Sequence, residues 1–263
     1  MTTCMTTSTP DRAAASRDGA SRTRVLVERP PGGGRLRVRT AATGGTSRPL
    51  LRAVLLSADE RTARVALVPE GALLLAGDEV AVEVEVGAGA TLELLEPAGT
   101  VAYDMRGASA RWDVDLRIGA GGSVVWHGEP FVAAAGSRVH RATRVVLGDG
   151  ARLALREQLV LGRYAEWPGT IEQELVATTA AGDPLLVEHL ALGPDTVGMA
   201  LGGRRVLASV LCLGADDGGP AAPERLELEG GGTLVRATAD EAHLATTADA
   251  WARAARAVRA VRT

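Results

Sequence analysis

Val86-Gly-Ala-Gly-Ala90, Ile118-Gly-Ala-Gly-Gly122 and Leu147-Gly-Asp-Gly-Ala151 are three copies of one short turn. Each copy joins two extended apolar segments, and successive copies are separated by 32 and then 29 residues. Gly-x-Gly lets the backbone adopt positive φ angles at little cost, which tight turns between strands require. A unit that recurs at about 30 residues is typical of stacked, layered architectures. The turns therefore predict a stacked-sheet, β-helical body that resembles a solenoid.

The segments beside these turns alternate apolar and polar residues with a period of two. The apolar positions are Val80, Val82, Val84 and Val86; Trp112, Val114, Leu116 and Ile118; and Leu153, Leu155, Leu159 and Leu161. The charged positions of the second segment are Arg111, Asp113, Asp115 and Arg117. This pattern predicts half-buried strands with a solvated charged face. Because turn signals recur without a long helical pattern between them, residues 24 to 236 are predicted to be all-β.

The two ends of the chain differ from this body. Residues 1–22 lack periodicity and are rich in Thr, Ser and charge, which predicts a disordered tail. Thr238-Ala-Asp-Glu241 fits a capping box before an alanine-rich stretch that predicts a helix. The expected parts are thus a tail (1–22), a β-helical domain (23–237) and a C-terminal helix packed on the β body (238–263).

Two stripes follow that predicted helix. Its apolar stripe is Leu244, Trp251 and Val258, and its basic stripe is Arg253, Arg256, Arg259 and Arg262. The apolar stripe is expected to pack on the sheet. The basic stripe fits either a solvated rim or a docking surface for an acidic partner.

The composition and the apolar pattern of the chain argue against several classes of partner and location. The chain has 263 residues and a net charge of −3, which gives no reason to expect nucleic acid or an anionic membrane. No apolar run approaches the ~18 residues of a membrane span. No basic-then-apolar signal segment opens the chain, and we expect a cytoplasmic protein. Cys4 and Cys212 are the only cysteines, so a structural disulfide is not expected.

Motif chemistry favours a protein without catalytic residues or a permanently bound cofactor. The chain contains no lysine, which excludes a phosphate-loop or Schiff-base lysine. The glycine turns lead into strands rather than helix N-termini, so they are not phosphate loops. No two histidines lie at metal-ligand spacing and neither cysteine has a CxxC partner, which argues against a closed zinc-type site. His127 and Glu129, two residues apart, suit a borderline cation such as nickel in transit.

Several carboxylates leave a second function open. Glu129, Glu157, Glu172 and Glu174 suit the paired carboxylates of a glycosidase, and β-solenoids that cleave polysaccharides use such groups. Aromatic residues make up only 3% of the chain, which leaves few platforms for sugar rings. The alternative function is therefore a β-solenoid carbohydrate-active enzyme, and a third is a plain β scaffold of another complex.

Several stretches together resemble one known family. They are Gly122-Ser-Val-Val-Trp-His-Gly-Glu-Pro-Phe131, Val145-Val-Leu-Gly-Asp-Gly-Ala-Arg-Leu-Ala154, Glu157-Gln-Leu-Val-Leu-Gly-Arg163, Glu96-Pro-Ala-Gly-Thr-Val-Ala-Tyr103 and Gly182-Asp-Pro-Leu-Leu-Val-Glu188. In this order they resemble the UreD (UreH) family of urease accessory proteins. The most specific is Glu157 followed by Leu161-Gly-Arg163. The sequence departs from the family pattern at Ala102 and Asp104, where a Lys and an Arg are usual. It therefore resembles a divergent member of the family.

The resemblance implies a non-enzymatic scaffold. Members bind UreF, which recruits the GTPase UreG, and the assembly docks on urease apoprotein. Nickel is expected to pass through polar internal tunnels toward the urease active site. The residues expected on this transient nickel path are Asp78, Glu129, Glu157 and Glu188, with His127 as an accessory. Gly162, Arg163 and Tyr103 are expected to serve turn geometry, an ion pair or an interface.

Overall fold

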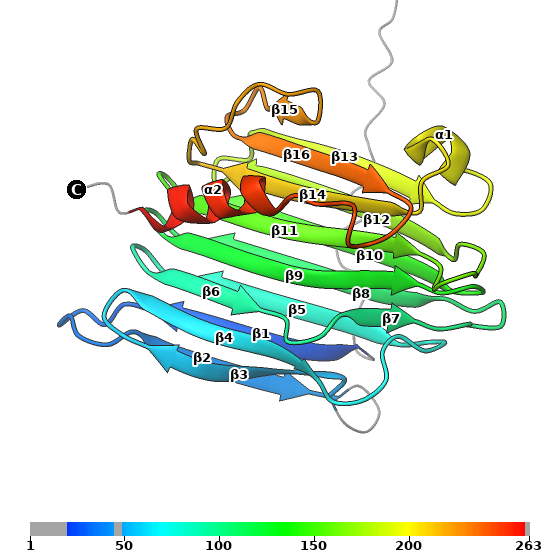
Figure 1. Cartoon of the computed structure of the whole chain (residues 1–263). Helices are drawn as coiled ribbons and strands as arrows, with labels where there is room; N and C mark the ends of the chain where they lie inside the picture. Colours follow the sequence, from blue (N-terminus) through cyan, green and yellow to red (C-terminus); the bar gives the residue numbers. More distant parts are fainter. Residues whose placement is uncertain (1–19, 45–48, 261–263) are drawn as a thin grey trace, which may run out of the picture.

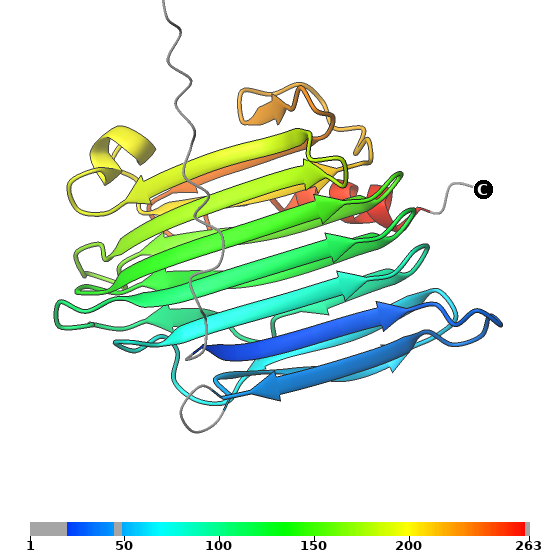
Figure 2. The same ribbon diagram turned by 180° about the vertical axis from the view of Figure 1, so that it is seen from behind.

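The chain winds back and forth between two facing β-sheets in the computed structural model, which describes residues 20–44 and 49–260 (Figure 1). Figure 2 shows the seven-stranded sheet from its outer side, in the order β13-β12-β10-β8-β5-β1-β2. Its strands are β1 (Ser21–Glu28), β2 (Arg37–Thr43), β5 (Glu79–Val86), β8 (Ala110–Ile118), β10 (Arg138–Leu147), β12 (Thr170–Thr179) and β13 (Pro184–Leu192).

The second sheet has nine strands, eight of them in the order β15-β16-β14-β11-β9-β6-β4-β3, with β7 paired to β9. Its strands are β3 (Leu51–Ala58), β4 (Thr62–Pro69), β6 (Thr91–Leu95), β7 (Thr100–Ala102), β9 (Ser123–Ala133), β11 (Arg152–Leu161), β14 (Val206–Leu213), β15 (Arg225–Glu227) and β16 (Thr233–Ala239). The helices are α1 (Val197–Leu201) and α2 (Ala248–Arg259).

The middle of the molecule consists of stacked parallel coils. Strands β5, β8, β10 and β12 pair in parallel in one sheet, and β6, β9 and β11 do so in the other. Each coil crosses from the first sheet to the second at one of the three glycine turns. Antiparallel pairs close both ends of the stack. The predicted solenoid-like, all-β body is therefore confirmed.

The two glycines of each turn have different roles. The second one has a positive φ, with values of +64° at Gly89, +63° at Gly121 and +65° at Gly150. The first one lies against the turn of the preceding coil, because a Cβ on Gly119 would lie 2.9 Å from Ala88 N. Such a separation is too short for real Cβ atoms, so the stacked turns need glycine there.

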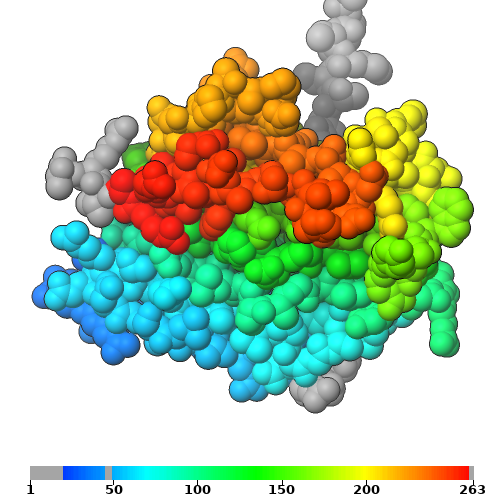
Figure 3. All heavy atoms as spheres, viewed as in Figure 1, coloured from blue at the N-terminus to red at the C-terminus, as the bar shows by residue number. Residues whose placement is uncertain are grey.

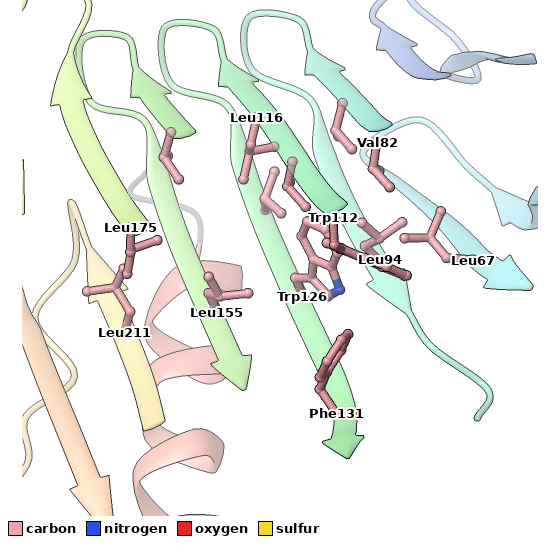
Figure 4. Close-up of a cluster of buried hydrophobic side chains, with 14 of the residues drawn as sticks. Leu67, Val82, Leu94, Trp112, Leu116, Trp126, Phe131, Leu155, Leu175 and Leu211 are labelled. Atoms are coloured by element: carbon pink, nitrogen blue, oxygen red, sulfur yellow. The ribbon is translucent and has the colours of Figure 1, made fainter. Parts of the chain in front are cut away.

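Apolar side chains fill the space between the sheets. The predicted apolar positions of β5, β8 and β11 are all buried. Figure 4 shows inward side chains from both sheets meeting there, with the aromatic rings of Trp112, Trp126 and Phe131 close together. The rings of Trp112 and Phe131 meet edge to face, with centroids 6.1 Å apart. This core between the sheets extends through all the coils.

Asp113 corrects one expectation about the outer face of β8. It was predicted to be solvated, but it is only 3% exposed. Its register neighbours on both sides are the small residues Ala81 and Ala142, and its carboxylate accepts a hydrogen bond from Arg111 Nε at 2.7 Å. A central strand flanked on both sides therefore buries a short polar side chain on its outer face.

The structure places both ends of the β body differently from the prediction. Strand β1 begins at Ser21, two residues before the expected boundary, and residues 1–19 of the predicted disordered tail lie outside the described residues. Thr238 pairs with Leu207 in the β14–β16 ladder, so the capping box does not form. Strand β16 ends at Ala239, and the helix begins only at Ala248.

Helix α2 covers the outer face of the nine-stranded sheet (Figures 1 and 3). It packs there through Ala250, Ala254, Ala255 and Val258, against side chains of β9, β11 and β14. Part of the basic stripe pairs within the molecule: Arg259 Nε lies 2.7 Å from Glu93 and Arg253 Nε lies 3.7 Å from Asp217. Leu244, predicted on the apolar stripe, lies before the helix and is 60% exposed.

Candidate functional site: a polar row between the sheets

Polar side chains interrupt the apolar interior near the middle of the coils. The inward positions of β11 are Leu153, Leu155, Glu157, Leu159 and Leu161, so one carboxylate stands among four leucines. The side chain of Glu157 is only 12% exposed. Because burial disfavours an unpaired charge, Glu157 needs a partner in the interior.

Arg141 of β10 is that partner. Its Nη2 donates to Glu157 Oε1 at 2.9 Å, and its Nη1 donates to Gln173 Oε1 at 2.8 Å. Gln173 Nε2 in turn donates to Glu157 Oε2 at 3.4 Å. The guanidinium also lies over the Phe131 ring, 4.7 Å from its centroid. One arginine from the seven-stranded sheet thus holds a carboxylate of the other sheet and an amide of its own.

Strand β9 has a bulge next to this pair. Its register against β11 shifts between Arg156 and Gln158, so Gly128 and Glu129 both lie beside Glu157. A Cβ on Gly128 would lie 2.5 Å from Arg156 O, which explains the glycine in the bulge. Bulges re-aim side chains. Here the bulge places Glu129 at the rim of the interior, where it lines the cavity described below although its side chain is 36% exposed.

Glu96, directly after β6, accepts hydrogen bonds from β9 at and beside this bulge. Its Oε1 accepts from Trp126 Nε1 at 2.9 Å and its Oε2 accepts from the backbone N–H of Glu129 at 3.3 Å. Burial raises the pKa of Glu96 to about 7, although the Trp126 hydrogen bond and the charge of Arg141 oppose this shift. A carboxyl with such a pKa takes up or releases a proton readily near neutral pH.

A small cavity lies among these groups. Its volume is about 30 Å³, enough for roughly two water molecules. Its charged lining residues include Glu96, Glu129, Arg141 and Glu157, and its aromatic ones Trp112, Trp126 and Phe131. Arg156 lines it as well, so the cavity combines three carboxyl groups and two guanidinium groups with aromatic walls.

The polar side chains continue from this cavity across the next strands. Ser209 of β14 is the register partner of both Glu157 and Arg236, and Arg236 of β16 forms an ion pair with Glu188 of β13 across the two sheets. Arg236 also lines a pocket of about 340 Å³ next to α1. We call the whole set the interior polar row: Glu96, Glu129, Arg141, Glu157, Gln173, Ser209, Glu188 and Arg236.

Comparison with known proteins decides the family. A family model described as UreD urease accessory protein matches residues 31–262. The chain belongs to the UreD family. Urease accessory protein UreD 1 of Streptomyces griseus subsp. griseus is 41% identical over 253 residues, which cover 93% of this chain and 97% of that protein.

Other relatives agree. UreD of Frankia casuarinae is 36% identical over 199 residues, covering 70% of this chain and 62% of that protein. UreD 1 of Saccharopolyspora erythraea is 36% identical over 188 residues, covering 68% and 72%. UreD membership supports a role in urease maturation, and it favours an accessory protein over the carbohydrate-active enzyme considered above.

Three of the carboxylates that the sequence selected in this UreD member lie on the interior polar row. They are Glu129, Glu157 and Glu188. Asp78 lies elsewhere, in an exposed turn before β5, where its Oδ2 accepts a hydrogen bond from Leu75 N at 2.7 Å. Asp78 thus shapes a turn and is not part of the row.

His127 lies beside Glu129 but on the outer face of the sheet, beneath α2. Its ring is 5.3 Å from that of Trp251, and its Nδ1 is 3.5 Å from Glu129 Oε1. Arg156 Nη1 is 3.1 Å from its Nε2, which makes Nε2 the hydrogen-bond acceptor. Burial and the Arg156 charge lower the pKa of His127, so the ring is neutral at pH 7. Its acceptor nitrogen is occupied by Arg156.

The loop after β11 holds two of the predicted structural residues. Gly162 has a φ of +80°, and Arg163 pairs with Glu166 across the turn, with Nε to Oε1 at 2.8 Å. Arg163 lowers the pKa of Glu166 to about 2. The third, Tyr103, donates its backbone N–H to Leu74 O at 3.0 Å.

The two departures from the family pattern lie off the polar row. Ala102 is fully buried in β7, where it pairs with Ala133 of β9. Asp104 is exposed, and its Oδ1 accepts a hydrogen bond from Arg106 N at 2.9 Å. The interior polar row therefore forms without a basic residue at either position.

Sequence reasoning missed five of the eight residues of the interior polar row. Glu96, Arg141, Gln173, Ser209 and Arg236 were not selected. Arg141 carries a readable signal, because it stands at an inward position of a strand whose other inward residues include Val139 and Val145. Glu96 carries none, since its place depends on the bulge in β9.

Two further findings concern metal binding and membrane insertion. Among residues 20–44 and 49–260, no three His, Cys, Asp or Glu side chains are grouped so that they could hold a metal ion. Within the same ranges, no helix is long and apolar enough to cross a membrane.

Proposed function

We propose that this chain is a cytoplasmic, non-enzymatic scaffold that joins UreF, and through UreF the GTPase UreG, to urease apoprotein. Within that assembly it passes nickel toward the urease active site along the interior polar row. Nickel is cargo here, and no cofactor stays bound.

One observation carries the proposal: charged side chains run across successive coils in an interior that leucine and valine otherwise fill. Burying carboxylates and guanidinium groups contributes little to stability compared with apolar packing of the same volume. Glu129, Glu157 and Glu188 come from three different strands, and all lie on the row. A transport role gives a reason to keep these charges, since they offer successive oxygen ligands to a cation.

The ligand types suit transfer rather than storage. Conduction requires sites that a cation enters easily and leaves easily. Carboxylate and amide oxygens that already have partners compete weakly with water for nickel, whereas imidazole or thiolate ligands hold such metals more tightly. His127 serves as an accessory only if Arg156 moves, because Arg156 now occupies its acceptor nitrogen.

The scaffold role is tested by co-expression with UreF, UreG and urease subunits, followed by affinity capture of this chain. We expect UreF and apo-urease to co-elute with it. If a folded, soluble sample captures neither, the scaffold proposal is wrong.

The nickel path is tested with Glu157→Gln in the same assembly. We expect complex formation to persist while urease nickel content and urease activity fall severalfold. The matched control is Glu172→Gln, which removes an exposed carboxylate on the outer face of β12. If urease matured with Glu157→Gln contains as much nickel as urease matured with the wild type, the interior polar row is not the nickel path.

A further inference from the structure

We propose that Arg141 is a gate on the interior polar row: its guanidinium occupies the oxygen ligands of Glu157 and Gln173, and a divalent cation passes only after this side chain has turned away. The inference rests on the nickel path proposed above. It adds a closed state of that path, held by the chain itself.

The contacts of Arg141 define the closed state. One nitrogen lies 2.9 Å from Glu157 Oε1 and another lies 2.8 Å from Gln173 Oε1. Gln173 Nε2 binds the remaining oxygen of Glu157 at 3.4 Å. One guanidinium and one amide thus bind both carboxylate oxygens, so a metal that binds Glu157 has to compete with a hydrogen bond at either oxygen.

A cation cannot share this place with Arg141. Both would be positively charged and would compete for the same carboxylate in a poorly solvated cavity, where charges repel strongly. Arginine cannot escape the conflict by losing its proton. The side chain must therefore move if a cation is to bind Glu157.

Arg141 is held firmly on one side only. Its Nε is buried and has no hydrogen-bond partner among the described residues. The other contact of the guanidinium is the flat face of Phe131, whose ring centroid is 4.7 Å away. A cation–π contact tolerates sliding more readily than a hydrogen bond does. Opening the gate breaks the two hydrogen bonds to Glu157 and Gln173.

The gate is tested by equilibrium dialysis of nickel against the purified full-length chain. We expect Arg141→Gln to bind nickel at least about tenfold more tightly than the wild type, because Glu157 is released. The double variant Arg141→Gln/Glu157→Gln should lose this gain. The control Arg144→Gln, on the same strand but facing outward toward Asp115, should leave binding unchanged.

A second variant keeps the proposal testable if Arg141→Gln does not fold. Arg141→Lys keeps the charge that compensates Glu157 but cannot hold Glu157 and Gln173 together, so we expect a smaller gain in nickel affinity. Nickel binding equal to the wild type in a folded Arg141→Gln or Arg141→Lys protein overturns the gate.

The dialysis needs no partner protein, so its result is separable from the proposed function. If Arg141→Gln gains affinity while Glu157→Gln still supports full urease maturation, the nickel path is wrong although Arg141 does block Glu157. If Glu157→Gln impairs maturation and Arg141→Gln gains nothing, the gate alone is wrong.

Discussion

At the scale of single residues, the Arg141–Glu157 pair makes a clear prediction about stability. Glu157→Ala leaves a guanidinium buried without its charge partner and should lower the free energy of unfolding by about 3 kcal/mol. Replacing both residues, as Arg141→Met/Glu157→Leu, should recover most of this loss, since apolar side chains then fill the same space. Urea unfolding at neutral pH measures all three proteins.

The control for this prediction is Arg144→Met, which removes an outward-facing arginine paired with Asp115 at 3.6 Å. It should change the free energy of unfolding by no more than about 1 kcal/mol. A double variant less stable than Glu157→Ala would contradict the account.

Glu96 predicts a pH dependence. Its pKa is raised in the folded protein to about 7 from an ordinary value of 4.5, so the folded state binds a proton more tightly than the unfolded state. Stability should therefore fall as pH rises from about 4.5 to about 7 and then level off. In Glu96→Gln this decline should be smaller, as measured by denaturation midpoints at several pH values.

Glu166→Gln is the matched control for that pH series. The pKa of Glu166 is lowered to about 2, so its contribution to stability is lost only as pH falls below the ordinary value of 4.5. The variant should leave the decline between pH 4.5 and 7 unchanged. An identical decline in Glu96→Gln and the wild type would show that Glu96 is not its source.

At the scale of elements, the stacked corners predict unequal effects of two neighbouring glycines. Gly119→Ala would place a Cβ 2.9 Å from Ala88 N, whereas Gly121→Ala meets nothing within 4 Å and pays only for its φ of +63°. We expect losses in the free energy of unfolding of about 3 and about 1 kcal/mol. Chemical denaturation of both variants checks this, and equal losses would contradict the packing of one turn on the next.

Helix α2 predicts a protease-sensitive variant. Ala254 is fully buried against the sheet and Ala252 is exposed on the same helix. Ala254→Glu should undock the helix and speed tryptic cleavage at its arginines by about tenfold or more, because opening becomes more populated. Ala252→Glu should be cleaved like the wild type. The β signal in circular dichroism should persist in both variants.

At the scale of the whole molecule, the edge strand β3 predicts self-association. Val54, Leu55 and Leu56 are 39%, 41% and 54% exposed at the edge of the nine-stranded sheet. Exposed apolar edge strands pair with other chains. Leu56→Lys should lower the average mass of the isolated chain in light scattering at high concentration, whereas Ser57→Lys, at the neighbouring exposed position, should lower it less. Equal average masses for the wild type and Leu56→Lys would show that the β3 edge is not the site of self-association.

The assembled molecule shows which features could be predicted from the sequence and which could not. The glycine turns act locally, and they predicted the stacked β body. Glu157 was visible because it breaks a run of inward leucines. Arg141 could be noticed as a charge at an inward position of an apolar strand, but its pairing with Glu157 depends on how the two sheets face each other, and the place of Glu96 depends on the bulge in β9. Thr238 shows the opposite failure: its local helix signal is overridden by pairing with Leu207 in the ladder.

The stacked corners also bear on chain length. Gly119 N donates to Val86 O at 2.7 Å and Gly148 N donates to Ile118 O at 2.8 Å, so consecutive coils present the same backbone acceptor to the next one. A duplicated coil inserted at this point would meet the bonding partners that its neighbours already use. The body is in this sense modular, and duplication or deletion of whole coils would lengthen or shorten the distance between its two capped ends.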